Sequence, residues 1–186
     1  FNDLFWQPGG NPQLNAETGK NNSISIRLNQ ILNGNLDLNI FNSKTYNLIQ
    51  WRPIQSYWQA ENIDNVIRYG ITGYLTQNNR YFNTKLSFGI TESYHGKDKR
   101  RLRYTPKNIG TIFFEKNIKN FTISTDIHYI SEMISAYSYP KNNIIPKSSI
   151  TSIHLIHKTT FNRFDLIFSA SAKNIFDTEY ESSKGY

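Results

Sequence analysis

The chain has 186 residues, with 21 Lys and Arg against 14 Asp and Glu, a formal net charge of +7 and no cysteine. The missing cysteine excludes a disulfide scaffold, a zinc-cysteine site and a cysteine nucleophile. No apolar run approaches the ~20 residues of a membrane-spanning helix, which excludes a helical membrane protein but not a membrane β-barrel, whose strands alternate apolar and polar residues.

The chain opens with a dense turn signal. Residues 1–17 read FNDLFWQPGGNPQLNAE, and Pro8-Gly9-Gly10-Asn11-Pro12 lies at the centre of the segment. Glycine adopts positive φ at little cost, and proline fixes φ while removing a backbone donor. This segment is therefore expected to be an irregular loop that leads into the first strand.

Alternation of apolar and polar residues recurs along the rest of the chain. In Leu36-Asp37-Leu38-Asn39-Ile40 the period of two places the apolar residues on one face of a strand and the polar residues on the other. The same division recurs near 68–76, 82–90, 121–129 and 164–173. We expect eight strands, near 18–32, 35–51, 58–77, 81–94, 104–116, 120–133, 148–158 and 163–173.

Short and long links alternate between the expected strands. The short links, at 33–34, 77–80, 116–120 and 160–162, suit hairpin turns. The longer connections include 52–57, 95–103 and 134–147. Several strands exceed ten residues, which favours an outer-membrane barrel over the alternative of a soluble β-sandwich. In such a barrel the apolar sets face lipid and the polar sets face the lumen, including Asp37, Asn39, Arg68, Lys85, Asp126 and Asp165.

Three motifs occur in the order known from one family. Residues 1–17 resemble the FNDLYWP-GGNPDLKPE stretch of TonB-dependent outer-membrane receptors, with Asn15-Ala16 in place of Lys-Pro. Residues 46–53 (YNLIQWRP) are similar to the family's DLIxW strand end, and residues 173–180 (KNIFDTEY) to its NLFDxxY signature. The resemblance covers essentially the whole chain.

The resemblance implies an all-β fold, an antiparallel transmembrane β-barrel with long external loops and short periplasmic turns. In that family 22 strands close around an N-terminal plug, and residues 1–186 would supply about eight of them, strands fourteen to twenty-one. The plug, the TonB-contacting segment, the early strands and the last strand would then lie outside this sequence. Because the first residue is Phe1 rather than Met, we expect the chain to begin inside a longer polypeptide.

The resemblance also implies a function at the bacterial outer membrane. The expected protein imports a ferric siderophore or cobalamin, is surrounded by outer-membrane lipid, and is driven by a TonB-type coupling protein through the missing plug. No enzyme activity, cofactor, metal site or nucleic-acid partner is expected. The alternative hypothesis is a non-transporting surface adhesin or a soluble carbohydrate-binding β-domain.

The expected ligand residues lie in external loops, and all but one are aromatic. Aromatic rings cover a bulky chelate or corrin while losing few rotamers. They are Phe5, Trp6 and Gln7 in the first loop, Tyr57 and Trp58 in the second, and Tyr137 and Tyr139 in the fourth. A basic cluster, Lys97, Lys99, Arg100, Arg101 and Arg103, would attract an anionic ferric chelate, and a solvated loop is its alternative explanation.

Four histidines are the remaining candidates for chemistry, namely His95, His128, His154 and His157. His154 and His157 are an odd number of residues apart and should point to opposite faces of a strand. His128 and Asp126 should share the lumen face as a polar pair. No motif adds a nucleophile, so no catalytic residue is expected.

Overall fold

The computed structural model describes residues 2–31, 33–54, 56–63, 65–138 and 141–181, and these residues are almost entirely β-structure. The short helix α1 (Asn2–Phe5) precedes the strands. Among the described residues, none of the helical structure is long and apolar enough to cross a membrane. The chain divides into two compact units, and each is considered by itself. Unit 1 contains Phe1–Ser23, Phe41–Tyr69 and Glu92–Leu102, and unit 2 contains Ile24–Ile40, Gly70–Thr91 and Arg103–Tyr186.

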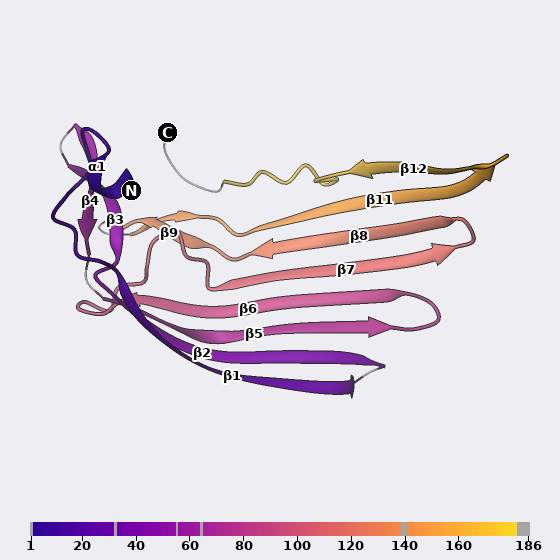
Figure 1. The fold of residues 1–186 in the computed structure, drawn as a ribbon, viewed down its shortest axis with the longest axis horizontal. Coiled ribbons are helices and arrows are strands. Elements are labelled where there is room, and N and C mark those ends of the chain that lie inside the picture. The colour runs from indigo at the N-terminus through magenta and orange to yellow at the C-terminus, as the bar shows by residue number, and fades with distance from the viewer. Residues whose placement is uncertain (1, 32, 55, 64, 139–140, 182–186) are drawn as a thin grey trace. The chain divides into compact units, whose positions relative to one another are not determined.

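The main sheet has eight strands in the order β1-β2-β5-β6-β7-β8-β11-β12 (Figure 1). Strands β6, β7, β8, β11 and β12 pair antiparallel, so the predicted all-β antiparallel architecture is confirmed. The strand bounds are β1 (Thr18–Ile31), β2 (Gly34–Tyr46), β5 (Val66–Asn78), β6 (Asn83–His95), β7 (Asn108–Ile118), β8 (Phe121–Ile130), β11 (Ser148–Phe161) and β12 (Phe164–Ala172).

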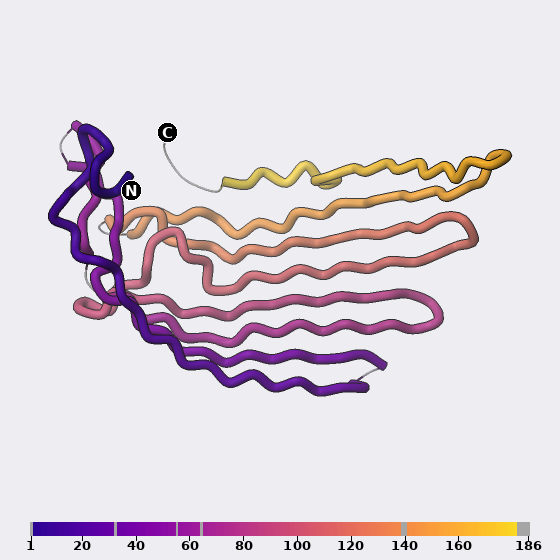
Figure 2. The backbone as a smooth tube through the Cα atoms, in the orientation of Figure 1, coloured from indigo at the N-terminus to yellow at the C-terminus, as the bar shows by residue number. Residues whose placement is uncertain are grey.

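The short links are tight hairpin turns, as predicted. Ile118 pairs with Phe121 and Phe161 pairs with Phe164, so two residues make each of these turns. Lys119 and Asn162 adopt positive φ there, at 52° and 55°, as the right-handed twist of hairpin strands favours. The β5–β6, β7–β8 and β11–β12 turns lie at the same end of the sheet (Figure 2).

Two predicted strands were too long. The stretch 35–51 breaks into β2 and β3 (Ile49–Ile54), and the stretch 58–77 breaks into β4 (Tyr57–Asn62) and β5. Strands β3 and β4 pair with each other in a separate hairpin. The break falls at Asn47, whose φ of 54° is left-handed and turns the chain out of the main sheet.

The predicted loop 134–147 also contains structure. Strands β9 (Met133–Ala136) and β10 (Asn143–Ile145) form a second small hairpin. Each small hairpin is inserted between two strands of the main sheet, so the connections β2–β5 and β8–β11 are long while the alternate connections are short. The alternation of long and short links is therefore confirmed.

The sheet of unit 2 has one polar and one apolar face. Ser87, Thr111 and His128 are direct cross-strand partners on one face, and Leu86, Ile112 and Ile127 are partners on the other. Many large apolar side chains of the second face are exposed, including Ile90, Phe114, Ile123, Leu155 and Phe168. A water-soluble sheet buries such a face, whereas a membrane strand presents it to lipid.

Unit 1 contains a small buried core of its own. Ala60, Val66 and Leu102 are at most 8% exposed. These residues lie in β4, in β5 and in the loop that follows β6, where the backbone amide of Leu102 donates to the carbonyl oxygen of Ser93. This unit positions the loop residues that the sequence singled out.

Candidate functional site

The first loop is fixed to the β3–β4 hairpin by an aromatic contact and a charge-assisted hydrogen bond. Trp51 Nε1 donates to Asp3 Oδ1 at 2.7 Å. The ring of Trp6 lies edge-on to that of Trp51, with centroids 5.4 Å apart and planes at 68°. Edge-to-face rings are favoured over a face-to-face sandwich, and a hydrogen bond to a carboxylate is stronger than one between neutral groups. The turn-rich segment is therefore an ordered element of unit 1.

Gly9 allows the backbones of the first loop and of β4 to approach closely. Gly9 is buried, and its carbonyl oxygen accepts from the Ala60 amide at 2.9 Å. A Cβ on Gly9 would stand 1.8 Å from the carbonyl oxygen of Trp58 and 2.6 Å from the Trp51 ring. Asn11 Nδ2 donates to the Ala60 carbonyl at 3.2 Å, next to this contact. Only glycine fits this position.

Four exposed aromatic residues are carried by these two braced elements. Trp6 and Phe5 are 59% and 56% exposed, Trp58 is 51% exposed and Tyr57 is 38% exposed. We call this set the aromatic surface. The structure thus places the expected residues of the first and second loops in one unit, with the exposed Gln7 beside them in the chain. Their role in ligand binding stays a prediction.

The two expected ligand residues of the fourth loop, Tyr137 and Tyr139, do not lie in unit 1. Tyr137 follows β9 in unit 2 and is partly buried. Tyr139 lies outside the described residues. Only the expected ligand residues of the first and second loops therefore lie in unit 1, and the ligand role of the whole set stays a prediction.

The basic cluster is partly neutralised by its own carboxylates. Arg100 forms a salt bridge with Asp98, and its bonds hold the pKa of the Asp98 carboxyl below its ordinary value. Arg101 Nε lies 3.8 Å from Glu92 Oε2. Lys97 and Lys99 have no ion pair within the described ranges, and Arg103 belongs to unit 2. The attraction for an anion in unit 1 therefore comes mainly from the two lysines.

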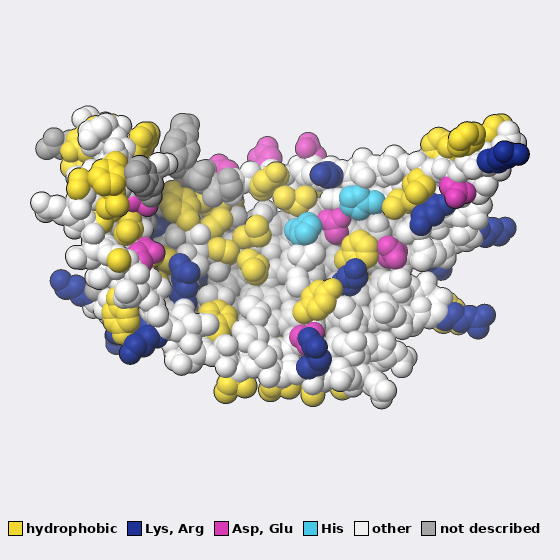
Figure 3. Space-filling view, viewed as in Figure 1, with side chains coloured by type: hydrophobic (Ala, Val, Ile, Leu, Met, Phe, Trp, Pro, Cys, Tyr) yellow, Lys and Arg dark blue, Asp and Glu magenta, His cyan; other side chains and the backbone are white. Residues whose placement is uncertain are grey.

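The polar face of unit 2 carries a hollow of about 820 Å³. Its polar lining residues include Asp37, Asn39, Thr72, Ser87, Thr111 and His128, and Tyr74, Ile109 and Ile130 also line it. In Figure 3 charged and hydrophobic side chains are scattered over a white surface of backbone and other side chains. Hydroxyl and amide groups of this kind suit a surface in contact with water or with another polar surface.

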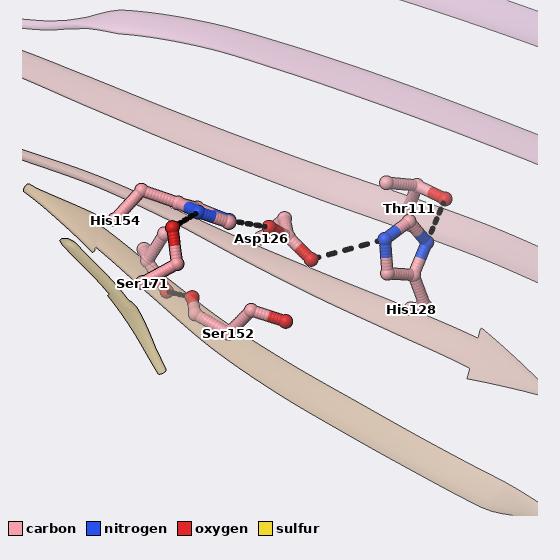
Figure 4. A network of polar contacts seen from close by, with 7 residues as sticks. Thr111, Asp126, His128, Ser152, His154 and Ser171 are labelled. Carbon is pink, nitrogen blue, oxygen red and sulfur yellow. Dashed lines mark hydrogen bonds and ion pairs between the residues drawn. The ribbon is translucent and has the colours of Figure 1, made fainter. Parts of the chain in front are cut away.

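A chain of polar contacts crosses four strands next to this hollow (Figure 4). Each carboxylate oxygen of Asp126 contacts one imidazole. Oδ2 lies 3.0 Å from His128 Nε2, and Oδ1 lies 2.8 Å from His154 Nε2. The other ring nitrogens continue the chain, since His128 Nδ1 lies 3.0 Å from Thr111 Oγ1 and His154 Nδ1 lies 2.9 Å from Ser171 Oγ. We call these five residues the histidine network.

The histidine network contains a serine, a histidine and a carboxylate in contact, but it does not have the other parts of a hydrolase site. Ser171 lies in the β11–β12 ladder, opposite His154. Backbone N–H groups of strands lie in the plane of a sheet, so they cannot converge on an oxyanion above its face. Among the described residues, no group of three His, Cys, Asp or Glu side chains is placed to hold a metal ion. The network's evident effect is to tie β7, β8, β11 and β12 together.

Sequence reasoning found only part of this network. The period of two correctly placed Asp126 and His128 on one face and separated His154 from His157. The contacts of His154 with Asp126 and Ser171 depend on the register between β8, β11 and β12. The tight Phe161-Asn162-Arg163-Phe164 turn was the available signal, because a two-residue loop fixes the register of the hairpin.

Replacing Asp126 by alanine should destabilise the sheet of unit 2. The change leaves two partly exposed imidazoles, His128 at 53% and His154 at 30%, without their shared acceptor. The net contribution of such a hydrogen bond is about 0.5–1.5 kcal/mol. Urea unfolding of the full-length protein in micelles measures this cost. Asp165→Ala is the matched control, because within the described residues Asp165 accepts only from Thr160, across one hairpin. Equal losses in both variants would contradict the role of the network.

Comparison with known proteins identifies the same fold. The sequence model described as "TonB dependent receptor-like, beta-barrel" matches residues 1–174. The vitamin B12 transporter BtuB of Vibrio vulnificus (strain YJ016) is 34% identical over 73 residues, which are 38% of this chain and 12% of the transporter.

Solved structures agree in fold at low sequence identity. The pyoverdine outer-membrane receptor FpvA from Pseudomonas aeruginosa PAO1 matches 93% of this chain with a TM-score of 0.73 and 12% identity, and 27% of its own length is covered. The copper transporter OprC matches 91% with a TM-score of 0.73 and 14% identity, and 26% of that chain is covered. The chain thus spans about a quarter of the solved structures it matches.

Proposed function

The chain belongs to the TonB-dependent receptor family, whose members lie in the outer membrane of Gram-negative bacteria, and we propose that it forms part of the barrel wall of a nutrient importer. Its apolar face contacts lipid, and its polar face lines the lumen. A soluble carbohydrate-binding domain does not agree with membership of this family. A surface adhesin is the competing function for the external loops.

The aromatic surface carries the proposal. A ligand-binding loop needs large apolar contact area held in one conformation, because ordering a flexible loop on binding lowers affinity. Here Phe5, Trp6, Tyr57 and Trp58 are exposed, while Asp3, Gly9 and Trp51 brace the elements that carry them. Rigid exposed rings of this kind suit a bulky, partly apolar molecule that arrives from outside.

The polar face supplies the second part of the proposal. A ligand released from the loops would pass a wall of hydroxyl, amide and imidazole groups that includes the hollow beside the histidine network. In the whole receptor we expect a plug to occupy the lumen and a TonB-type protein to drive its movement. Both would lie in segments outside residues 1–186.

We propose an anionic ferric siderophore as the substrate class, with cobalamin as the second choice. Relatives and fold neighbours include a vitamin B12 transporter, a pyoverdine receptor and a copper transporter, so family membership alone does not choose among them. Lys97 and Lys99 favour an anion, since unit 1 gives them no carboxylate partner among its described residues. A neutral corrin would gain nothing from these charges.

Truncating the aromatic surface should weaken ligand binding. In the full-length receptor, Trp6→Ala and Trp58→Ala should each cost about 1–2 kcal/mol, about five- to thirtyfold in affinity, because they remove large preorganised contacts. Binding of ferric chelates and of cobalamin to whole cells measures this. Tyr81→Ala is the control, because Tyr81 is 67% exposed but lies in the β5–β6 turn of unit 2.

The outcomes separate the alternatives. A siderophore receptor is supported if Trp6→Ala and Trp58→Ala weaken ferric-chelate binding and if Lys97→Gln and Lys99→Gln weaken it further. Cobalamin binding that depends on the aromatic surface but not on the lysines replaces the siderophore with cobalamin. Unchanged binding of both ligands, together with lost adhesion to host glycans, would favour the adhesin.

A further inference from the structure

Cations occupy the tips of the short turns in unit 2. Arg80 lies in the β5–β6 turn, Lys119 in the β7–β8 turn and Arg163 in the β11–β12 turn, and Lys116 lies two residues before the end of β7. All four are exposed. The turn segments 76–82, 116–123 and 158–164 contain no Asp or Glu. Dark-blue Lys and Arg side chains accordingly gather at this end of the sheet (Figure 3).

A histidine is stacked between two phenylalanines on the apolar face at the same end. His157 is the register partner of Phe121 in β8 and of Phe168 in β12. Its ring lies 4.3 Å from that of Phe121 with planes at 12°, and 6.3 Å from that of Phe168 with planes at 21°. His157 is on the opposite face from the histidine network, because His154 is three residues earlier in the strand.

The ring nitrogens of His157 need hydrogen-bond partners from outside the protein. Within the described part of the chain, its ring nitrogens make no hydrogen bond. Phe121 is 42% exposed and Phe168 is 58% exposed, so the stack is open outward. An N–H placed among apolar rings at a membrane surface needs a headgroup or water as its partner.

The stack lies next to the β7–β8 turn, which carries Lys119. His157 pairs with the first residue of β8, and the Lys158 amide donates to the carbonyl of Asn120 in the β7–β8 turn at 2.9 Å. Lys116 is an even-numbered residue of β7 on the apolar face, and it pairs with Ile123, two residues nearer the middle of the sheet than Phe121. Arg163 lies beyond the Phe161–Phe164 pair, farther towards the sheet end than His157. The cations thus lie on both sides of the stack along the strands.

We propose that the Phe121–His157–Phe168 stack and the cations Lys116, Lys119 and Arg163 bind the phosphates of anionic phospholipids in the inner leaflet of the outer membrane. The inference rests on the proposed function, because it requires the short turns to face the periplasm. The rings contact acyl chains, and the imidazole and the cations reach the phosphates of neighbouring lipids. Lysine suits this place because its long stem stays on apolar surface while its ammonium group reaches the polar layer.

The charge and the exposed apolar rings of this site together favour an anionic phospholipid as its ligand. An acidic protein surface would match the cations, but it would not match the adjoining exposed phenylalanine rings at the edge of a lipid-facing sheet. A zwitterionic lipid would match the rings but would gain less from the uncompensated cations. A basic residue near an anionic leaflet contributes about 1 kcal/mol, about fivefold in affinity.

The test uses the full-length receptor in detergent, with phosphatidylglycerol and phosphatidylcholine as probes and native mass spectrometry as the readout. The wild type should retain phosphatidylglycerol about tenfold or more over phosphatidylcholine. The triple variant K116Q/K119Q/R163Q should lose this preference. His157→Phe, which keeps the stack and removes the nitrogens, should weaken phosphatidylglycerol binding several-fold. Lys85→Gln should change nothing, because Lys85 lies over Phe113 on the polar face.

Equal retention of both lipids by the wild type, or an unchanged preference in the triple variant, would overturn the site. A preference for lipopolysaccharide over phosphatidylglycerol would overturn the assigned leaflet. Uptake of ferric chelate by the same variants keeps the two proposals apart. Normal uptake with no lipid preference contradicts only this inference, whereas lipid preference without uptake of any ligand contradicts only the proposed function.

Discussion

Replacing Ile127 by arginine should reduce the amount of folded receptor in the outer membrane about tenfold or more. Ile127 is the register partner of Ile112 in β7 and of Thr151 in β11, on the apolar face of unit 2. An arginine that faces lipid near the bilayer midplane costs roughly 2–4 kcal/mol. Leu86→Arg should have the same effect, because Leu86 is the other partner of Ile112.

Asn39→Arg is the matched control on the polar face. Asn39 lines the hollow and is bonded to Ser25, so a cation there remains in a polar environment. Heat-modifiable migration of the receptor from isolated outer membranes measures the folded fraction. Equal tolerance of arginine at Ile127, Leu86 and Asn39 would show that the apolar face is not in contact with lipid.

The strands of unit 2 could be predicted because each shows the alternation of apolar and polar residues within its own sequence. Strictly alternating stretches such as Phe121–Ile130 place the side chains on two faces whatever the neighbouring strand is. Polar two-residue links such as Asn162-Arg163 then give antiparallel neighbours. Since faces and neighbours together define a meander, the sheet order followed from local patterns.

The small hairpins could not be predicted for the same reason. Tyr46 and Leu48 keep the even-numbered apolar pattern of β2 across Asn47. Asparagine tolerates the left-handed conformation, but β2 also contains Asn35, Asn39 and Asn42, so residue type does not single out Asn47 as the end of the strand. The β3–β4 pair is then stabilised by the first loop, through Asp3 and Gly9, which are about fifty residues away in the sequence. Contacts of that separation depend on tertiary packing, which overrides local preference.

The candidate site divides along the same line. Aromatic residues in the first and second loops can be identified from the sequence and the resemblance, but the bracing of Trp51 by Asp3 depends on tertiary packing. The basic cluster is visible in the sequence as a run of charges, whereas the pairing of Arg100 with Asp98 depends on the conformation of the loop. The residue types thus indicate which loops carry charges and aromatic rings, and the contacts of these residues determine which of them are available to a ligand.

Replacing Gly9 by alanine should detach the first loop from the β3–β4 hairpin and lower ligand uptake about tenfold or more. The added methyl group would stand 1.8 Å from the Trp58 carbonyl oxygen, and this oxygen belongs to a paired strand that cannot turn aside as a side chain would. Ordinary overpacking of a side chain costs about 1–3 kcal/mol, and a clash between backbones costs more. The loop should therefore leave its position, and Trp6 should lose its contact with Trp51.

Proteolysis of intact cells that express the full-length receptor reports on this detachment, since cleavage within residues 1–17 should become rapid in the Gly9→Ala variant. Gly19→Ala is the control in the same unit, because a Cβ there meets only the Lys44 carbonyl oxygen at 3.6 Å, an ordinary contact. The folded fraction in the outer membrane should stay normal in both variants, because the apolar face of unit 2 is unchanged. If the Gly9→Ala receptor resists cleavage within residues 1–17 and takes up ligand as well as the Gly19→Ala receptor does, the braced first loop does not bind the ligand.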